Sequence, residues 1–304
     1  MENQPITFQL PDGRALTFAE YGSRVGRPVL YFHGLSGSRL EPAMFGDDEI
    51  ETAGIHLIAI DRPGMGGSAY QPKRTFNQWP ADVGCFADQF GLEKFGVFGV
   101  SGGSGYVCAC ARWIPERLTA AVIASGAGNM VSTVAQVKLS PMARLMWRLA
   151  GWSPGLFSLV MGLSKPRLPD DPVKIRQQMM SSLPPAEAAV FEKPGRLEAF
   201  MASGNESIRQ GMRGIAWDTH LYARDWGFSL EDIRFPVHLL HGEADINVPV
   251  EVARQVAAAI PSCQATFYPD EGHFSTVINH LDRIFDILGG VSVLDKDYYK
   301  MVRR

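Results

Sequence analysis

Short, nearly continuous apolar runs recur along the chain and are separated by segments with helical periodicity. The runs occupy residues 28–34, 55–64, 95–103, 118–126, 236–245 and 265–273. β-Branched and aromatic residues dominate them, which is typical of strands buried on both faces of a parallel sheet. Helical patterns lie between them at about 76–91, 104–114, 249–260 and 275–287. This alternation predicts an α/β fold with a doubly wound, mostly parallel sheet.

Two segments depart from the alternation. Apolar and polar residues alternate at 6–10 and 15–22 around the turn sequence PDGR, which predicts a β-hairpin. Between about 129 and 227 the pattern is helical, interrupted by proline-rich stretches and rich in methionine and tryptophan. Such an insertion predicts a helical cap over the strand ends. We therefore expect a core domain of residues 1–128 and 228–304 and a cap of residues 129–227.

Composition narrows the class of partner. The 304 residues include 46% hydrophobic and 20% charged residues, and the net charge of -3 comes without a basic cluster that would favour nucleic acid or an anionic membrane. The first residues lack the features of a signal peptide, so we expect a cytoplasmic protein. Zinc-type spacing is missing around the four cysteines, Cys85, Cys108, Cys110 and Cys263. The expected partner is a small molecule, bound by a monomer or homodimer.

One short sequence places a hydroxyl inside a tight strand-to-helix turn. The apolar run that starts at residue 95 leads into G-V-S-G-G at 99–103, and a helical pattern follows directly. A sharp reversal exposes its apex side chain and leaves room only for small residues two positions to either side. We therefore predict that Ser101 is a nucleophile; the other interpretation is a glycine-rich helix start. Ser104 is the alternative hydroxyl, but Tyr106 is too large for its turn.

A serine hydroxyl needs a base to remove its proton, and an acid usually orients that base. His273 follows the last apolar run, and Asp245 follows the run before it. Because the carboxyl ends of parallel strands meet at one edge of a sheet, we expect Ser101, Asp245 and His273 to form a catalytic triad. Weaker candidates for the orienting acid are Glu243, Asp270 and Glu271.

Acyl transfer also needs hydrogen-bond donors for the oxyanion of its tetrahedral intermediate. The N–H of Gly102, directly after the nucleophile, is one predicted donor. The second predicted donor is the N–H of Leu35. This residue lies in the sequence HGLSGSR at 33–39, which starts within the last two residues of the apolar run at 28–34. His33 is interpreted as a structural residue that braces this oxyanion loop.

Together these motifs resemble the α/β-hydrolase fold superfamily and, within it, capped serine hydrolases of the esterase or lactonase type. The resemblance is carried by H-G at 33–34, D-R-P-G-M-G-G-S at 61–68, G-V-S-G-G at 99–103, H-G-E-A-D at 241–245 and G-H at 272–273. It implies cleavage of an ester, lactone, thioester or amide through an acyl-enzyme, with no metal or organic cofactor. Ser36 stands where many relatives have proline, which predicts a less rigid oxyanion loop.

Several other polar residues are interpreted as structural. Asp61 and Arg62 are expected to brace the turn formed by residues 61–68. Asp218 and His220 lie in the helical pattern at 205–228 and, two residues apart, cannot share one face of a helix. We expect both to be solvated or to pack within the cap.

The methionine and tryptophan content of the cap predicts an adaptable apolar pocket. The candidates for substrate binding are Met146, Trp147, Trp152 and Trp217. They favour a medium-to-large, mostly apolar acyl or alcohol group. Similar caps occur in small-molecule esterases and lactonases, some acting on macrolide-type macrocyclic lactones, so inactivation of such an antibiotic is one hypothesis. The alternatives are a lyase, a cofactor-free dioxygenase, an acyltransferase, or a hydrolase-like receptor for a small ligand.

Overall fold

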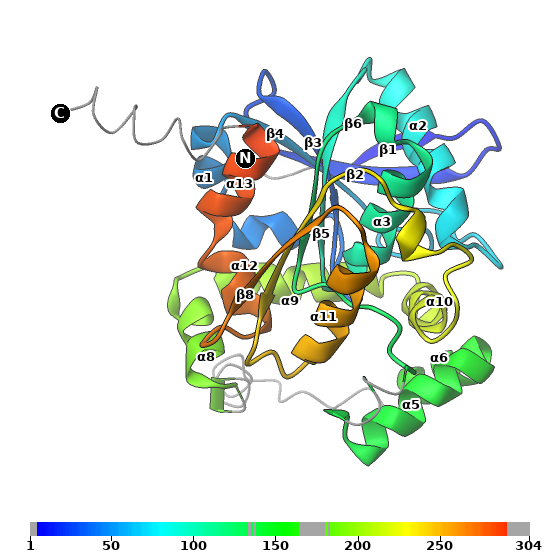
Figure 1. Cartoon of the computed structure of the whole chain (residues 1–304). Coiled ribbons are helices and arrows are strands. Elements are labelled where there is room, and N and C mark those ends of the chain that lie inside the picture. The colour runs from blue at the N-terminus through cyan, green and yellow to red at the C-terminus, as the bar shows by residue number, and fades with distance from the viewer. Residues whose placement is uncertain (1–4, 133–134, 136–137, 164–179, 182, 291–304) are drawn as a thin grey trace.

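An eight-stranded sheet runs through the computed structural model, which describes residues 5–132, 135, 138–163, 180–181 and 183–290 (Figure 1). In spatial order the strands are β1 (Ile6–Gln9), β2 (Ala15–Gly22), β4 (Ile55–Ile60), β3 (Arg27–Phe32), β5 (Phe95–Val100), β6 (Leu118–Ala124), β7 (Val237–Gly242) and β8 (Cys263–Tyr268). β1 and β2 form the predicted antiparallel hairpin, and β2 also pairs antiparallel with β4. All pairs from β4 to β8 are parallel, which confirms the mostly parallel sheet.

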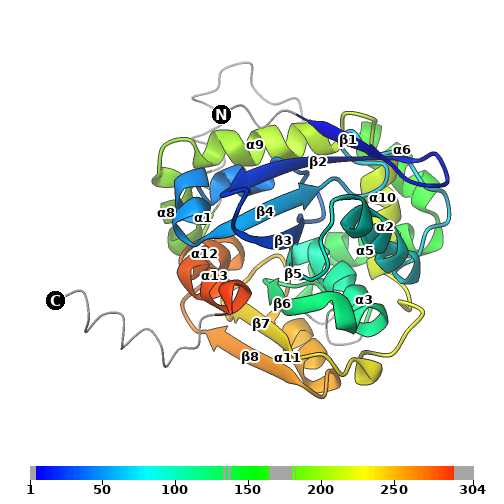
Figure 2. The same ribbon diagram turned by 90° about the horizontal axis from the view of Figure 1, so that it is seen from above.

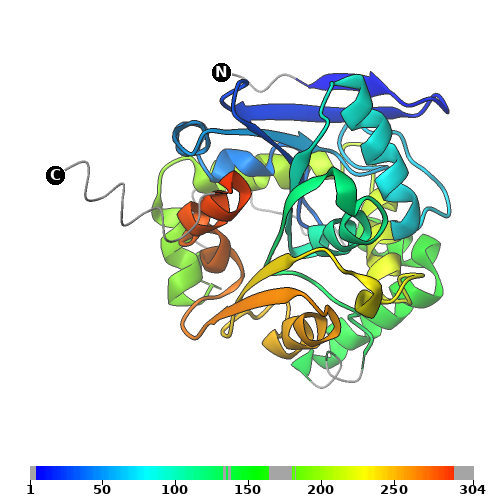
Figure 3. The same cartoon turned by 45° about the horizontal axis from the view of Figure 1, so that its top comes forward.

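Helices cover both faces of this sheet. α2 (Trp79–Gln89), α3 (Ser104–Trp113) and α11 (Val250–Ala259) pack on one face, while α1 (Asp47–Thr52), α12 (His273–Ile278) and α13 (Leu281–Gly289) pack on the other. Figure 3 shows this layering, with orange-red α12 and α13 on one side of the strands and cyan-green α2 and α3 on the other. The fold is therefore doubly wound, as the alternating pattern predicts.

Side-chain alternation along the strands supplies both apolar layers. In β3, Leu30 and Phe32 enter the core under α2 and α3, whereas Val29 and Tyr31 enter the core under α1 and α13. Because both faces are covered, the inner strands are apolar at nearly every position. β8 differs from the prediction of burial on both faces. It is the edge strand, and its side chains are half-buried or exposed.

The helix expected at 275–287 is two helices. α12 ends at Ile278 and α13 begins at Leu281. Between them, His280 has a φ of −123°, which is outside the helical region. Its ring stacks on that of Tyr268 in β8, with 3.7 Å between ring centroids. This contact accompanies a break in the helix that the apolar periodicity does not reveal.

The helices between β6 and β7 fall into two groups. α5 (Pro141–Trp152) and α6 (Pro154–Leu163) pack against α10 (Arg213–Tyr222). α8 (Pro185–Glu192) packs against α12, and α9 (Arg196–Ser207) packs against the short helix η1 (Glu41–Met44) (Figures 1 and 2). Residues 164–179 of the predicted cap lie outside the described residues. Among the residues that are described, none of these or the other helices is long and apolar enough to cross a membrane.

Candidate active site

Ser101 lies at the turn between β5 and α3. Its φ is 51°, in the left-handed region that a residue with a side chain rarely adopts. The glycines around it are required by close approach, because a Cβ on Gly103 would lie 2.0 Å from the carbonyl oxygen of Phe32. A Cβ on Gly99 would lie 2.7 Å from the carbonyl oxygen of Gly103. The G-x-S-x-G sequence therefore forms the tight turn that its spacing predicts.

Asp245 and His273 meet at the carboxyl ends of the parallel strands, where Ser101 also lies. The Nδ1–H of His273 donates to Oδ2 of Asp245 over 2.7 Å. The other carboxylate oxygen accepts the backbone N–H groups of Asn247 and Val248, at 2.8 and 2.9 Å. Burial raises the pKa of Asp245, but the charge and hydrogen bond of His273 outweigh burial and the net pKa is lowered. Asp245 is therefore an ionised, rigidly held acceptor that fixes the orientation of the imidazole.

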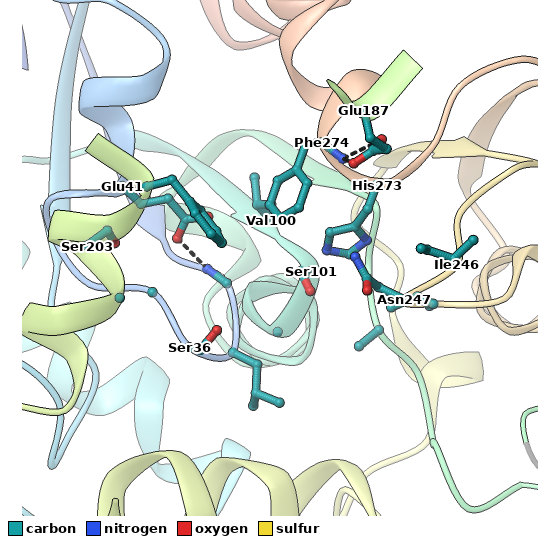
Figure 4. Close-up of a pocket in the computed structure, with 18 of the residues that line it drawn as sticks. Ser36, Glu41, Val100, Ser101, Glu187, Ser203, Ile246, Asn247, His273 and Phe274 are labelled. Carbon is teal, nitrogen blue, oxygen red and sulfur yellow. Dashed lines mark hydrogen bonds between the residues drawn. The ribbon is translucent and has the colours of Figure 1, made fainter. Parts of the chain in front are cut away.

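The imidazole of His273 faces the Ser101 hydroxyl across a pocket (Figure 4). Within the described part of the chain, no hydrogen bond joins the two side chains, and such bonds often tighten only when substrate is bound. Because Nδ1 carries the proton donated to Asp245, Nε2 is the nitrogen free to accept a proton. Burial lowers the pKa of His273, whereas Asp245 and the nearby carboxylates of Glu187 and Glu41 raise it, with a net increase.

Two further contacts hold the segment that carries His273. The Ser125 hydroxyl, at the end of β6, donates to the carbonyl oxygen of His273 over 2.7 Å. Glu187, on α8, accepts the backbone N–H groups of Phe274 and Ser275 at 3.0–3.1 Å and also the Ser275 hydroxyl at 3.1 Å. The position of the histidine thus depends on β6 and on a helix of the segment between β6 and β7.

The backbone of Gly102 lies against that of Leu35. A Cβ on Gly102 would be 2.8 Å from the Leu35 nitrogen. The Leu35 N–H has no hydrogen-bond partner among the described residues, and the first N–H groups of a helix, including that of Gly102, have none within it. The loop around Leu35 is braced by His33, whose Nε2 accepts the Arg62 N–H and whose Nδ1–H donates to the Gly34 carbonyl. Two backbone donors are therefore available beside Ser101.

A cavity of about 420 Å³ opens above Ser101. Its described lining is mostly apolar or aromatic, with contributions from the oxyanion loop, the turn at Ser101, α8, α9 and the segment after β7. The titratable residues in this described lining are Glu41, Glu187, Tyr222 and His273. Among the described residues, no group of three histidine, cysteine, aspartate or glutamate side chains is placed to hold a metal ion.

The four predicted substrate-binding residues do not share one location. Trp147 lines the cavity. Met146, its neighbour in α5, instead packs with Ala150 and Phe157, because successive helix residues point about 100° apart. Trp152 is 79% exposed. Trp217 packs against the core, and its indole N–H donates to the Arg74 carbonyl over 2.8 Å. Met146, Trp152 and Trp217 are therefore not among the described residues that line this cavity, and their part in substrate binding stays a prediction.

Asp218 and Arg62 form part of a buried charge cluster outside the cavity. Arg62 donates to Asp218 over 2.6 Å, and Arg74 and Tyr106 also donate to this carboxylate. Arg62 reaches the Gly34 carbonyl as well, which ties the cluster to the oxyanion loop. Arg62 thus braces this region, and Asp218 packs inside the protein rather than being solvated. His220 points elsewhere, toward the Ala150 carbonyl at 2.9 Å.

A family model described as the alpha/beta hydrolase fold matches residues 27–279 of this chain. The chain belongs to the α/β hydrolase fold family. The match includes Ser101, Asp245 and His273, and it spans the strands β3 to β8 that carry them. The resemblance noted in the sequence is confirmed at the level of the superfamily.

Known relatives of this α/β hydrolase are distant in sequence. A Mycoplasma pneumoniae protein with the provisional name proline iminopeptidase is 23% identical over 91% of this chain and 94% of its own length. An esterase from Thermogutta terrifontis has a similar structure, with 20% identity, a TM-score of 0.62 and coverage of 99% and 100% of the two chains. The enol-lactonase from Burkholderia xenovorans LB400 has 16% identity, a TM-score of 0.63 and coverage of 92% and 97%. At these identities the structural matches establish the fold alone.

Three residues of this α/β hydrolase site, Glu41, Glu187 and Ser125, are not indicated by the sequence motifs. Glu41 closely follows a loop that also contains Ser36, Ser38 and Arg39, so its sequence context does not distinguish it from a solvated loop acid. Glu187 is far from Phe274 in sequence and lies in an ordinary alanine-rich helical segment, which offers no local signal. Ser125 directly follows β6, at the sheet edge where the pattern already predicts functional groups.

Proposed function

We propose that this protein is a serine hydrolase that cleaves a carboxylic ester or lactone through an acyl-enzyme. Ser101 is the nucleophile, His273 the general base and acid, and Asp245 the residue that orients the histidine. The observation that carries the proposal is the combination of a strained φ at Ser101 with the 2.7 Å contact between His273 and Asp245 at the same edge of the sheet.

The proposed reaction has two halves. Ser101 Oγ attacks the substrate carbonyl carbon while Nε2 of His273 takes the hydroxyl proton. The N–H groups of Leu35 and Gly102 donate to the resulting oxyanion. When the intermediate collapses, the bond to the leaving oxygen breaks and His273 returns the proton to that oxygen, which leaves an acyl-enzyme. Water, deprotonated by His273, then attacks the acyl carbon, and the acid departs as Ser101 regains its proton.

The apolar lining of the cavity supports a medium-to-large, mostly apolar substrate. Trp147, Phe191 and Met130 are among the side chains that would contact it. A macrocyclic lactone of the macrolide type belongs in the substrate panel as one member of this class. A lyase, a cofactor-free dioxygenase, an acyltransferase or a small-ligand receptor would use the same cavity without multiple-turnover hydrolysis.

A fluorophosphonate tests the activated serine directly. Intact-mass measurement should show a single adduct on the wild-type protein and none on Ser101→Ala. Ser104→Ala is the matched control, because Ser104 is a buried neighbouring hydroxyl that donates to the Ala127 carbonyl and should not be labelled. With an ester substrate, Ser101→Ala and His273→Ala should each lower kcat by about 10⁴-fold or more. An adduct that persists on Ser101→Ala contradicts the proposed nucleophile.

Because one relative is named as an iminopeptidase, hydrolysis of an amide bond is the second reaction to test. An ester and an amide with the same acyl group would be compared under identical conditions. The proposal expects the ester to be hydrolysed with the higher kcat/KM. A higher kcat/KM for the amide would assign the protein to the peptidases or amidases while leaving the serine mechanism in place.

A further inference from the structure

The substrate cavity is lined by two buried acids and, apart from His273, by no described basic residue. Glu41 and Glu187 both line the cavity, and both are buried. The described lining includes no lysine or arginine. Buried carboxylates are normally paired with cations or fully hydrogen-bonded, because removing a charge from water costs free energy. The two carboxylates differ in what compensates their charge.

Glu187 is compensated by the protein itself. It accepts the N–H groups of Phe274 and Ser275 and the Ser275 hydroxyl, which occupy both of its oxygens. Its role in holding the His273 segment accounts for its burial. Glu187 therefore does not by itself point to a ligand.

Glu41 is not compensated in this way. Its Oε2 accepts the backbone N–H of Gly34 over 2.7 Å, and within the described residues it forms no ion pair (Figure 4). Burial raises the pKa of Glu41 to about 7. The carboxylate lies close enough to the reaction centre that a charged His273 lowers the pKa of Glu41. A buried acid at the edge of a substrate cavity is thus left without a directly paired cation among the described residues. Besides the Gly34 N–H, the more distant Arg62 charge, a charged His273 and the Tyr31 hydroxyl lower its pKa.

Aromatic side chains cluster in the same cavity. Phe191, Phe200 and Phe274 all line it, and their ring centroids are 5.2–5.5 Å apart in each pair. Aromatic faces carry negative electrostatic potential and attract cations, most strongly when water is excluded. A single cationic group entering the cavity would find both kinds of partner there.

We propose that the substrate carries a cationic nitrogen, an ammonium or quaternary ammonium group, which binds beside Glu41 and the three phenylalanines while its ester carbonyl lies at Ser101. This inference rests on the proposed function, since it names the substrate class for that site. Glu41 sits at the start of η1, directly after the oxyanion loop, so one short segment both stabilises the oxyanion and selects the charge of the substrate.

Isosteric ester pairs test the charge alone. Butyrylcholine and 3,3-dimethylbutyl butyrate differ only in a quaternary nitrogen or carbon on the alcohol side. The p-nitrophenyl esters of 4-(trimethylammonio)butyrate and 5,5-dimethylhexanoate differ in the same way on the acyl side. At pH 8.5 the cationic member of at least one pair should have a kcat/KM higher by about 10- to 100-fold. Equal values in both pairs, with the neutral esters turned over, would overturn the inference and leave the hydrolase proposal intact.

Glu41→Gln should remove most of the preference for the cationic ester and leave only the few-fold part that the aromatic rings supply, because the amide oxygen can still accept the Gly34 N–H but carries no charge. Phe200→Leu should lower the ratio by a smaller factor of about 3- to 10-fold. Glu231→Gln, which removes one charge from an exposed position outside the cavity, is the matched control and should leave the ratio as in the wild type. A ratio unaffected by Glu41→Gln contradicts the assignment of this residue.

The pH dependence of the ratio provides a readout that a structural role would not change. As pH falls from 8.5 to 6, Glu41 takes up a proton and the preference for the cationic ester should decline, since the pKa of Glu41 is about 7. The groups that act on Glu41 are Tyr31, Arg62 and His273. Protonation of His273 lowers kcat/KM for both esters by the same factor, so it does not change the ratio. In Glu41→Gln the ratio should be independent of pH over this range.

Binding to the Ser101→Ala protein separates this inference from the proposed function. Choline and 3,3-dimethylbutanol would be titrated calorimetrically into that variant with and without Glu41→Gln. Tighter binding of choline that is lost with Glu41→Gln supports the cationic subsite even if no ester is turned over. Equal binding of the two alcohols contradicts it. Absence of both turnover and fluorophosphonate labelling would contradict the hydrolase proposal alone.

Discussion

Asp218 and Glu41 are both buried acids, yet their surroundings are opposite. Asp218 is fully buried and accepts hydrogen bonds from Arg62, Arg74 and Tyr106. Burial raises its pKa, but the two arginines outweigh burial and the net pKa is lowered. Glu41 is 8% exposed, accepts a hydrogen bond from the Gly34 N–H, and has its pKa raised to about 7 by burial.

The difference separates a structural charge from one available to a ligand. Asp218, on α10, joins Arg62 after β4 to Arg74 before α2, so its ion pairs connect the segment between β6 and β7 to the sheet. Each of the three charged groups has an ion-pair partner inside the protein, although Arg74 Nε has no hydrogen-bond partner among the described residues. The Glu41 carboxylate faces the cavity, and fewer protein groups compensate its charge. Its replacement should therefore change the free energy of unfolding in a different direction from the replacement of Asp218, and with a different pH dependence.

Asp218→Asn is expected to have the largest effect on stability. The substitution leaves Arg62 and Arg74 buried with two positive charges and no acid, which should lower the free energy of unfolding by about 3–5 kcal/mol. Urea denaturation at pH 8 measures the loss.

The control for Asp218→Asn is an exposed ion pair. Glu243→Gln removes the partner of Arg254 at the surface and should change the free energy of unfolding by about 1 kcal/mol or less. If Asp218→Asn were no more destabilising than this control, the cluster would not be the rigid connection that its geometry indicates.

Glu41→Gln should change how stability depends on pH. The folded-state pKa of about 7 lies above the ordinary value of 4.5, so protonation of Glu41 favours the folded state. This contribution is fully present below about pH 4.5 and is lost as pH rises through 7. Relative to Glu41→Gln, the wild type should therefore lose about 2–3 kcal/mol of unfolding free energy between pH 5 and pH 8.

Denaturant melts of both proteins across that pH range measure the difference. A difference that stays constant with pH would mean that Glu41 titrates in the folded protein as it does in the unfolded chain. In that case Glu41 would not be a carboxylate destabilised by burial. It would then no longer differ from Asp218 in this respect, and the comparison would fail.

The sheet and the positions of Ser101, Asp245 and His273 were predictable because they follow local rules. Each strand is marked by a continuous apolar run, and each of these residues follows such a run within a few positions. Parallel strands bring their carboxyl ends together, so sequence order alone is enough to group the three residues. Their chemical assignment as a triad remains a prediction for the labelling experiment.

The pocket walls were not predictable in the same way. Met146 and Trp147 are adjacent in α5 but point into different environments, and the apolar pattern cannot tell which faces the cavity. Glu187 acquires its role only through contacts with Phe274 and Ser275, which lie far away along the chain. Such roles depend on how helices pack against the sheet, and periodicity reports only that a face is buried.

Glu187 lies between the two extremes, because its charge is compensated by N–H and hydroxyl groups rather than by arginines. In Glu187→Gln one side-chain oxygen can still accept a hydrogen bond, but the amide NH₂ group faces an N–H or hydroxyl donor. This should lower the free energy of unfolding by about 1–2 kcal/mol. The loss should be smaller than that of Asp218→Asn, since no buried cation is left unpaired.

The same substitution should also alter the pH profile of hydrolysis. Glu187 raises the pKa of His273, so removing its charge should move the acid limb of kcat/KM to lower pH. Glu187→Ala removes the hydrogen bonds as well, and it should lower kcat more than Glu187→Gln because the His273 segment loses its support from α8. The idea fails if wild type and Glu187→Gln have the same pH profile and if Glu187→Gln and Glu187→Ala have the same kcat. Glu187 would then only cap a helix and would not act on His273.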